Sequence, residues 1–192
     1  MKARLFCTTI ITVLFTIFCQ AQTATISGKV GLGVSNLSST AEEFEIVLKN
    51  QITNDSVVIP LTTVDYTFNN VPLGGSYIIY VNTAKNNEDY LNGVSTLDLV
   101  MITRHILGVD QFNNPYKSLA ADVSEDGRVS VLDLVMLRSL ILGITTALNH
   151  SWIVRLQEDI TKEKIIINNL SGDLVNQNFV LIKKGDINGN PK

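Results

Sequence analysis

The sequence predicts an α+β protein with three parts: a small antiparallel β-sandwich, a two-helix module, and a short C-terminal β segment. Residues 23–84 form short apolar and polar alternations that are typical of half-buried strands, and they show no helical period. Residues 97–108 recur as residues 132–143, with a constant offset of 35 and eight identities in twelve positions. Each copy places apolar residues at helical spacing and ends in glycine, so the repeat predicts two equivalent helices.

The first 21 residues have the composition of a secretory signal peptide. Lys2 and Arg4 precede an apolar run from Leu5 to Phe18, and small residues stand at the −3 and −1 positions of a cut after Ala21. The run is shorter than the roughly 20 apolar residues that a transmembrane helix needs. We therefore expect a secreted, cell-surface or periplasmic protein whose mature chain does not span a membrane.

Removal of residues 1–21 changes the charge and the cysteine content. The full chain carries 18 acidic and 15 basic residues, a net charge of −3, and loss of Lys2 and Arg4 makes the net charge −5. This acidic excess argues against a nucleic-acid partner. Both cysteines, Cys7 and Cys19, leave with the signal peptide. Since the mature chain cannot form disulfides, a bound metal is the first candidate for additional stabilisation.

The predicted strands lie on both sides of the repeat. β-Branched and aromatic residues, bounded by turn-forming residues, predict strands at 25–30, 44–49, 56–64, 76–81, 152–156, 164–168 and 179–183. Short connections predict that the parts pack together. We accordingly divide the mature chain into a β-sandwich module at 22–85, the repeat at 86–144, and a C-terminal β segment at 145–192 that packs on the preceding modules.

The loop before the second predicted helix has the spacing of an EF-hand-type calcium loop. Its oxygen-bearing side chains occupy positions 1, 3, 5, 9 and 12, glycine (Gly127) is at position 6, and a main-chain carbonyl is available at position 7. Ca²⁺ binds six to eight oxygens, which alternate residues of a tight loop can supply. The candidate ligands are Asp122, Ser124, Asp126, Arg128 (carbonyl), Ser130 and Asp133. The alternative is a solvated turn with Ser130 as the helix N-cap.

The loop before the first helix matches this pattern less well. Its candidate ligands are Asn87, Asp89, Asn92, Ser95 and Asp98, while Leu91 stands at position 5 and the glycine is displaced to position 7. Calcium binding and its absence are both compatible with this loop. Residues 186–190 resemble the opening of a third loop but lack positions 9 and 12, so the sequence predicts a turn without metal there.

Two loop–helix units of the form Leu-Asp-Leu-Val-Met resemble a type I dockerin over residues 86–144. With Phe179–Gly189 they are similar to dockerin-like tails of large secreted Bacteroidetes proteins. The motifs Ile26-x-Gly28-x-Val30 and Tyr66-x-Phe68 resemble transthyretin-like or carboxypeptidase-regulatory-type sandwich modules, which implies a structural spacer. The dockerin resemblance implies a non-catalytic module that binds calcium and a cohesin domain, usually within polysaccharide-degrading assemblies.

The resemblance also implies which residues contact a partner. The family's contact positions correspond here to Thr96, Leu97, Thr103, Arg104, Val131, Leu132, Arg138 and Ser139. Leu97, Val131 and Leu132 are apolar where cellulosomal dockerins often carry Ser or Thr, so a cellulosomal cohesin is doubtful. These residues either contact another extracellular protein or pack on the flanking β modules.

The sequence favours a binding or structural role over catalysis. His105 and His150 have no His or Cys nearby, and no nucleophile, zinc or phosphate-loop motif is present. We therefore expect no enzymatic activity and a calcium-binding interaction module. The alternative is an adhesive or polysaccharide-binding module, whose stacking residues would be Trp152, Tyr77, Tyr80 and Tyr116.

Overall fold

The computed structural model describes residues 22–34, 44–84 and 89–191, which form eight strands and three helices. The predicted signal peptide and Asn87 lie outside the described residues. In chain order the elements are β1 (Thr23–Leu32), β2 (Glu45–Asn50), β3 (Ser56–Pro60), β4 (Asp65–Pro72), β5 (Tyr77–Asn82), α1 (Thr96–Ile106), α2 (Pro115–Ala121), α3 (Val131–Ile141), β6 (Trp152–Leu156), β7 (Ile165–Ile167) and β8 (Phe179–Lys183). The α+β class is confirmed.

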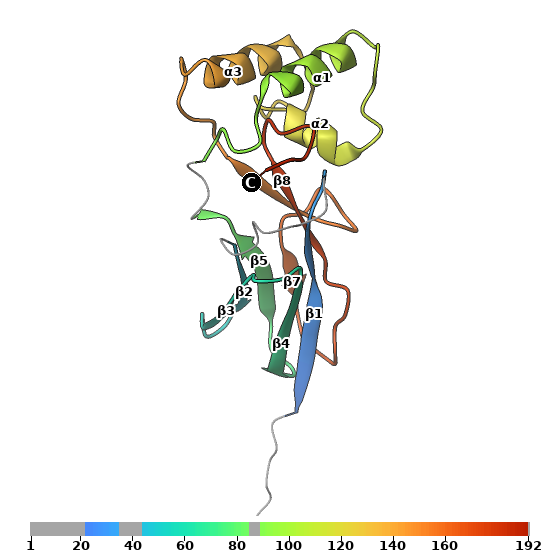
Figure 1. Cartoon of the computed structure of the whole chain (residues 1–192). Helices are drawn as coiled ribbons and strands as arrows, with labels where there is room; N and C mark the ends of the chain where they lie inside the picture. Colours follow the sequence, from blue (N-terminus) through green and yellow to red (C-terminus); the bar gives the residue numbers. More distant parts are fainter. Residues whose placement is uncertain (1–21, 35–43, 85–88, 192) are drawn as a thin grey trace, which may run out of the picture.

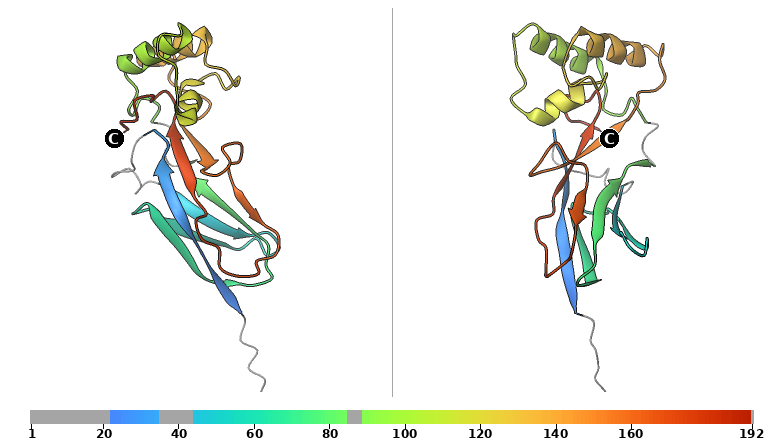
Figure 2. Two further views of the ribbon diagram at one scale, coloured as in Figure 1. Left: turned by 90° about the vertical axis from the view of Figure 1, so that its right-hand side faces the viewer. Right: turned by 180° about the vertical axis from the view of Figure 1, so that it is seen from behind.

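The strands form two four-stranded sheets that face each other, with the helices gathered at one end (Figures 1 and 2). One sheet has the order β4-β1-β8-β6 and the other has the order β3-β2-β5-β7. Neighbouring strands pair antiparallel except β1 and β8, which run parallel with Val30 opposite Phe179. A parallel pair requires a long crossover connection, and turn signals in the sequence cannot reveal such a pairing.

The strands after the helices are members of the same sheets as the strands before them. β8 lies between β1 and β6, and β7 pairs with β5 at the edge of the second sheet. All three helices lie between β5 and β6 in the chain. The helical segment is therefore an insertion into the sandwich, and both of its ends are held by strands.

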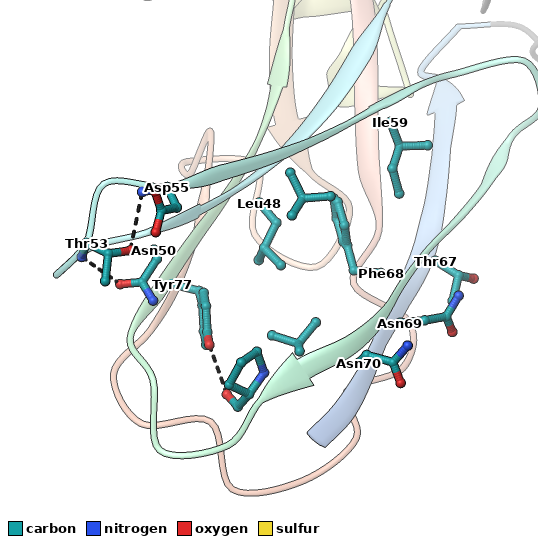
Figure 3. A pocket seen from close by; sticks show the side chains of 13 residues that line it. Leu48, Asn50, Thr53, Asp55, Ile59, Thr67, Phe68, Asn69, Asn70 and Tyr77 are labelled. Atoms are coloured by element: carbon teal, nitrogen blue, oxygen red, sulfur yellow. Dashed lines mark hydrogen bonds between the residues drawn. The ribbon is translucent and has the colours of Figure 1, made fainter. Parts of the chain in front are cut away.

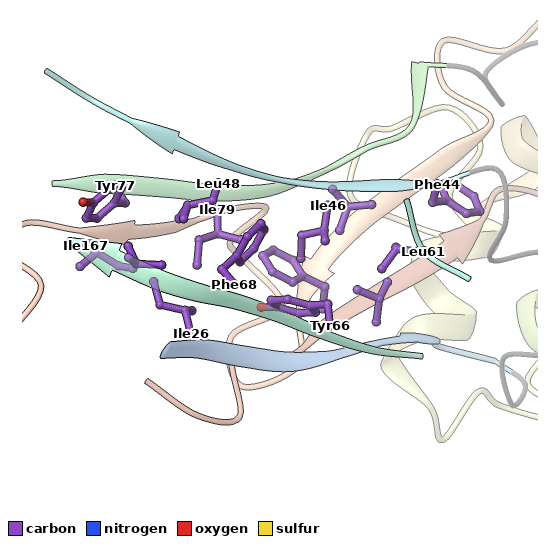
Figure 4. Close-up of a cluster of buried hydrophobic side chains, with 14 of the residues drawn as sticks. Ile26, Phe44, Ile46, Leu48, Leu61, Tyr66, Phe68, Tyr77, Ile79 and Ile167 are labelled. Atoms are coloured by element: carbon purple, nitrogen blue, oxygen red, sulfur yellow. The ribbon is translucent and has the colours of Figure 1, made fainter. Parts of the chain in front are cut away.

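The sandwich core comes from alternating residues of both sheets (Figure 4). Ile26 of one sheet and Ile46 and Ile79 of the other have no exposed surface. Phe44, just before β2, meets Trp152 of β6 edge to face, with ring centroids 5.1 Å apart. Because Trp152 comes from the C-terminal segment, this segment completes the core.

The two predicted helices pack on each other through equivalent residues. Ile102 of α1 and Leu137 of α3 occupy the same position of the repeat, and both are fully buried in one apolar cluster. The cluster does not include α1 and α3 residues such as Leu97 and Leu132, which stay exposed. None of the helices in the described part of the chain has the length and apolar character needed to cross a membrane.

The short helix α2 was not predicted. It has only seven residues, too few to show a helical period, although Asn114 caps it by accepting a hydrogen bond from the Tyr116 N–H at 2.9 Å. Ala120 of α2 packs against Val180 and Ile182 of β8. Thus α2 is the helix that joins the helical insertion to the sandwich.

Candidate metal-binding loops and exposed helix faces

The loop from Asp122 to Asp133 connects α2 with α3. Val123, its second residue, is buried among the side chains of the helical cluster. Gly127 has a φ of +84°, the left-handed conformation that position 6 requires. The loop therefore has a fixed beginning and a sharp turn at the predicted residue.

The first residue of this loop gathers three donors. Asp122 Oδ1 accepts from the Asp126 N–H at 3.1 Å and lies 3.4 Å from Ser124 Oγ, and Asp122 Oδ2 accepts from the Gly127 N–H at 2.9 Å. These contacts draw the turn around one carboxylate. Oδ2 accepts only one hydrogen bond and keeps a lone pair that a cation can use.

The last residue, Asp133, is fully buried at the start of α3. Its Oδ1 accepts from the Ser124 N–H at 2.8 Å, and its Oδ2 accepts from the Ser130 N–H at 2.7 Å and the Ser130 hydroxyl at 3.1 Å. Burial alone would raise the pKa of Asp133, but the hydrogen bonds from Ser124 and Ser130 outweigh it and lower the pKa. The carboxylate is therefore charged at neutral pH.

The remaining predicted ligands of this loop do not all lie around one point. Asp126 is exposed, and its Oδ1 accepts from the Arg128 N–H at 2.9 Å. Within residues 22–34, 44–84 and 89–191, no three His, Cys, Asp or Glu side chains lie close enough together to hold a metal ion. The donor set of the loop is nevertheless all oxygen, from carboxylates, hydroxyls and a carbonyl, and this chemistry fits Ca²⁺.

Ser130 is also the N-cap of α3, as the alternative reading predicted. Its side chain accepts from the Leu132 N–H at 3.2 Å, while Asp133 accepts from its main chain, so the pair forms a capping box. Capping and calcium binding use the same loop and do not exclude each other.

Glu125, at position 4 of the loop, anchors it to the sandwich. Its Oε1 accepts from Lys184 Nζ at 2.7 Å and lies 2.9 Å from His150 Nδ1. Burial raises the pKa of Glu125. Hydrogen bonds and positive charge from Lys184 and His150 lower the pKa by a larger amount, so the net shift is downward. Lys184 is almost completely buried and also donates to the Asp122 carbonyl at 3.0 Å. No sequence pattern connects this lysine with Glu125, because the two residues lie 59 positions apart.

The first loop brings together only part of its predicted set. Asp98 is fully buried, and its Oδ2 accepts from the N–H and the hydroxyl of Ser95, both at 2.9 Å. Asp89 uses its main-chain carbonyl to accept from Ser151 Oγ at 3.1 Å, and Asn92 is half-buried. The other oxygen of Asp98 accepts from residues 187 and 188, which no sequence pattern connected with this loop.

Matched apolar residues of α1 and α3 are exposed. The equivalent pairs Leu97 and Leu132, Val100 and Val135, and Leu107 and Leu142 are 52% to 70% exposed, as is Val131. Leu97, Val131 and Leu132 therefore do not pack on the β modules, which removes that alternative. Of the polar candidates, Thr96, Arg104 and Arg138 are exposed, whereas Thr103 and Ser139 are half-buried and donate to main-chain carbonyls of their own helices.

The aromatic residues proposed for glycan stacking are not available as a group. Trp152 and Tyr77 are 5% and 4% exposed, and Tyr80 and Tyr116 are half-buried. His105 stacks on Phe112, with ring centroids 4.1 Å apart, and accepts from the Phe112 N–H at 3.1 Å. The stacking and the hydrogen bond give His105 a structural role.

A cavity of about 380 Å³ lies between the sheets at the end far from the helices (Figure 3). Leu48, Phe68 and Tyr77 form its apolar floor, and Tyr77 donates to the Pro72 carbonyl at 2.9 Å. Asp55 is the one titratable carboxylate among its lining residues. Glycoside hydrolysis normally requires a pair of carboxylates, so this lining does not support that reaction.

Residues 87–142 match the type I dockerin domain family. The match includes all three helices and the loop 122–133 and none of the strands, and it confirms the predicted resemblance of this segment to a type I dockerin. Dockerins of this type are non-catalytic modules that bind calcium and cohesin partners. No curated protein and no solved structure matches the chain.

Proposed function

Residues 87–142 are a dockerin-like module, and from this premise we propose that the protein is an extracellular docking module. It binds a cohesin-type domain through the exposed faces of α1 and α3, with calcium stabilising the loop that orders α3. The observation that carries the proposal is the row of exposed apolar residues at matched positions of the two helices.

The repeat has apolar residues at both buried and exposed positions, and only the buried ones are explained by packing between the helices. Ile102 and Leu137 form the contact between the helices, so packing explains them. Packing does not explain Val100 and Val135, which are 52% and 54% exposed. Contiguous exposed apolar surface is typical of protein interfaces. Because α1 and α3 carry equivalent residues, either helix can present the same surface to a partner.

Calcium would be held by Asp122, Asp126 and Asp133 with the hydroxyls of Ser124 and Ser130 and the carbonyl of Arg128. The ion would neutralise carboxylates that otherwise repel one another. It would also strengthen the start of α3, where Leu132 and Val131 lie. The described part of the chain contains no cysteine, and we propose that calcium takes the stabilising role that disulfides have in many secreted proteins.

The insertion of the helices between β5 and β6 supports a tethering role. The segments 22–85 and 145–192 contribute to the same sheets, and we propose that they act together as a rigid spacer that presents the segment 86–144. The predicted signal peptide supports a location outside the cytoplasm for this activity. Attachment to a scaffold or a polysaccharide-degrading assembly is the role that the dockerin match supports best.

Binding of the purified protein to a panel of recombinant type I cohesin domains, measured by biolayer interferometry with calcium or EGTA, tests the proposal. We expect calcium-dependent binding that the double variant Leu97→Asp/Leu132→Asp abolishes, since it places charge on both faces. Ile52→Asp is the matched control, because Ile52 is 77% exposed but lies in the turn between β2 and β3. Failure of every cohesin to bind, or equal loss in the control, would contradict the proposal.

A further inference from the structure

The C-terminal segment after β8 repeats the beginning of the loop 122–133. Asp186, Ile187 and Asn188 correspond to Asp122, Val123 and Ser124. Ile187 and Val123 are buried in the same apolar cluster, at 0% and 1% exposure. The carboxylate of Asp186 accepts from the Gly189 N–H at 2.7 Å and the Asn190 N–H at 3.3 Å. Asp122 Oδ1 likewise accepts from the N–H of Asp126, the residue four positions later.

The segment 186–190 contacts the start of α1 in the same way as the beginning of the loop 122–133 contacts the start of α3. Asp98 Oδ1 accepts from the Asn188 N–H at 3.1 Å and from the Ile187 N–H at 2.8 Å. In the second loop, Asp133 Oδ1 accepts from the Ser124 N–H at 2.8 Å. Asp98 and Asp133 are equivalent in the repeat, so Asn188 takes the place of the third loop residue. Residues 186–190 thus supply the first half of a loop whose second half is residues 93–98.

One buried oxygen in this arrangement has no partner. Among the described residues, Asp186 Oδ2 accepts no hydrogen bond, although Asp186 is only 1% exposed. Lys183, whose charge acts on Asp186, donates from its Nζ to the Tyr90 carbonyl at 3.1 Å and to Ser151 Oγ at 2.8 Å. Buried charges in proteins are normally paired or bound to metal ions.

The unpaired oxygen faces the other half of the split loop. A Cβ atom placed on Gly93 would lie 2.5 Å from Asp186 Oδ2, so the oxygen lies directly against the main chain of residue 93. Gly93 is equivalent to Arg128, whose carbonyl is at position 7 of the second loop. Gly93 has a φ of +76°, and because it has no side chain it allows the Asp186 carboxylate to lie this close to the main chain.

The charge of the arrangement also calls for a cation. Asp186 is 1% exposed, and its carboxylate lies within the electrostatic reach of the Asp98 carboxylate. Asp98 is itself fully buried. Two buried carboxylates beside amide, hydroxyl and carbonyl oxygens form a donor set for a hard divalent ion.

We propose that Asp186, Asn188 and Asp98 form a second calcium site that is split between the C-terminal segment and the start of α1. Ser95 and the carbonyl of Gly93 would complete its oxygen donors. The ion would attach the C-terminal segment to the helical insertion, at a place separate from the loop 122–133. The site does not depend on calcium binding by that loop.

This arrangement accounts for the irregular first loop. Leu91 stands where a ligand is expected at position 5, and it is 49% exposed. When residues 186–190 supply the first positions, residues 87–91 are released from that requirement. The sequence predicts a turn without metal at 186–190 because positions 9 and 12 are missing downstream. Ser95 and Asp98 supply them from the other end of the helical insertion.

Calorimetric titration of the purified protein with CaCl₂ tests the proposal. We expect two equivalents in the wild type and one in Asp186→Asn, which keeps the side-chain volume but removes the charge. Asp122→Asn is expected to lose the other equivalent, and the double variant both. Asp89→Asn is the matched control, because Asp89 would be a ligand only of a contiguous loop 87–98, and it should retain two equivalents.

Two equivalents in Asp186→Asn, or loss of one in Asp89→Asn but not in Asp186→Asn, would overturn the split site. A second measurement remains valid if Asp186→Asn does not fold. In Asp122→Asn, calcium should slow hydrogen exchange in the peptide covering 184–192, and the added substitution Asn188→Ala should reduce this protection. A hydrogen-exchange rate of this peptide that calcium does not change would refute the split site. Loss of calcium binding by the loop 122–133 alone would leave the protection of this peptide by calcium intact.

Discussion

Asp133→Ala tests whether the loop 122–133 couples calcium to stability. Asp133 is fully buried and accepts from two main-chain N–H groups, those of Ser124 and Ser130, at 2.8 and 2.7 Å. A hydrogen bond to a charged group contributes about 1.5–3 kcal/mol. Taking the lower end for each, we expect the substitution to reduce the free energy of unfolding by about 3 kcal/mol in EGTA.

Calcium increases this difference. An ion at 100 times its dissociation constant adds about 2.7 kcal/mol to the stability of the state that binds it. The wild type gains this amount and Asp133→Ala does not, so the total loss in calcium is about 6 kcal/mol. The calcium contribution of about 2.7 kcal/mol is similar to that of a disulfide, which is about 2–4 kcal/mol.

Urea unfolding followed by circular dichroism, in 5 mM EGTA and in calcium, measures both quantities. Ser139→Ala is a suitable control, because its hydroxyl donates only to the Val135 carbonyl of its own helix, at 2.9 Å. An equal loss of stability by Asp133→Ala in EGTA and in calcium would contradict the coupling, since the residue would then act only as a helix cap.

Two further predictions concern the sandwich and its junction with the helices. Burial lowers the pKa of Lys183 from 10.5 to about 8. Unfolding therefore takes up a proton between these two pH values, and the wild type should gain stability as the pH rises from 8 to 10.5. Lys183→Met should lack this rise, and parallel pH profiles of urea unfolding would contradict the assignment. Gly28→Ala should cost about 2 kcal/mol through overpacking, because its Cβ would lie 2.1 Å from the Gln177 carbonyl oxygen. Gly31→Ala, with no atom within 4 Å of the added Cβ, should leave the melting temperature almost unchanged.

Local patterns predicted most elements because each pattern depends on neighbouring residues. The alternation in residues 44–49 predicts β2, which spans Glu45–Asn50. The helical spacing after Ser95 and Ser130 predicts α1 and α3, and the equivalent acids Asp98 and Asp133 do form capping boxes. Helix α2 escaped prediction because seven residues are too few to establish a period.

Pairings between distant segments could not be read in the same way. The parallel contact of β1 with β8 joins Val30 to Phe179, and no turn connects these strands. The ion pair of Glu125 with Lys184 likewise depends on where β8 ends relative to the helices. Such contacts form only when the complete sandwich brings the two segments together.

The sequence alone reveals the repeated loop–helix unit, and it predicts a secretory signal peptide and calcium ligands in the loop 122–133, since each of these is encoded in a short continuous stretch. The tertiary structure alone decided that the helices are inserted into one sandwich and that their apolar residues Leu97 and Leu132 remain exposed. It also decided that Asn188 lies at Asp98. A side chain's burial and partners depend on strands that pair across the whole chain, whereas a helix or a loop forms from residues a few positions apart.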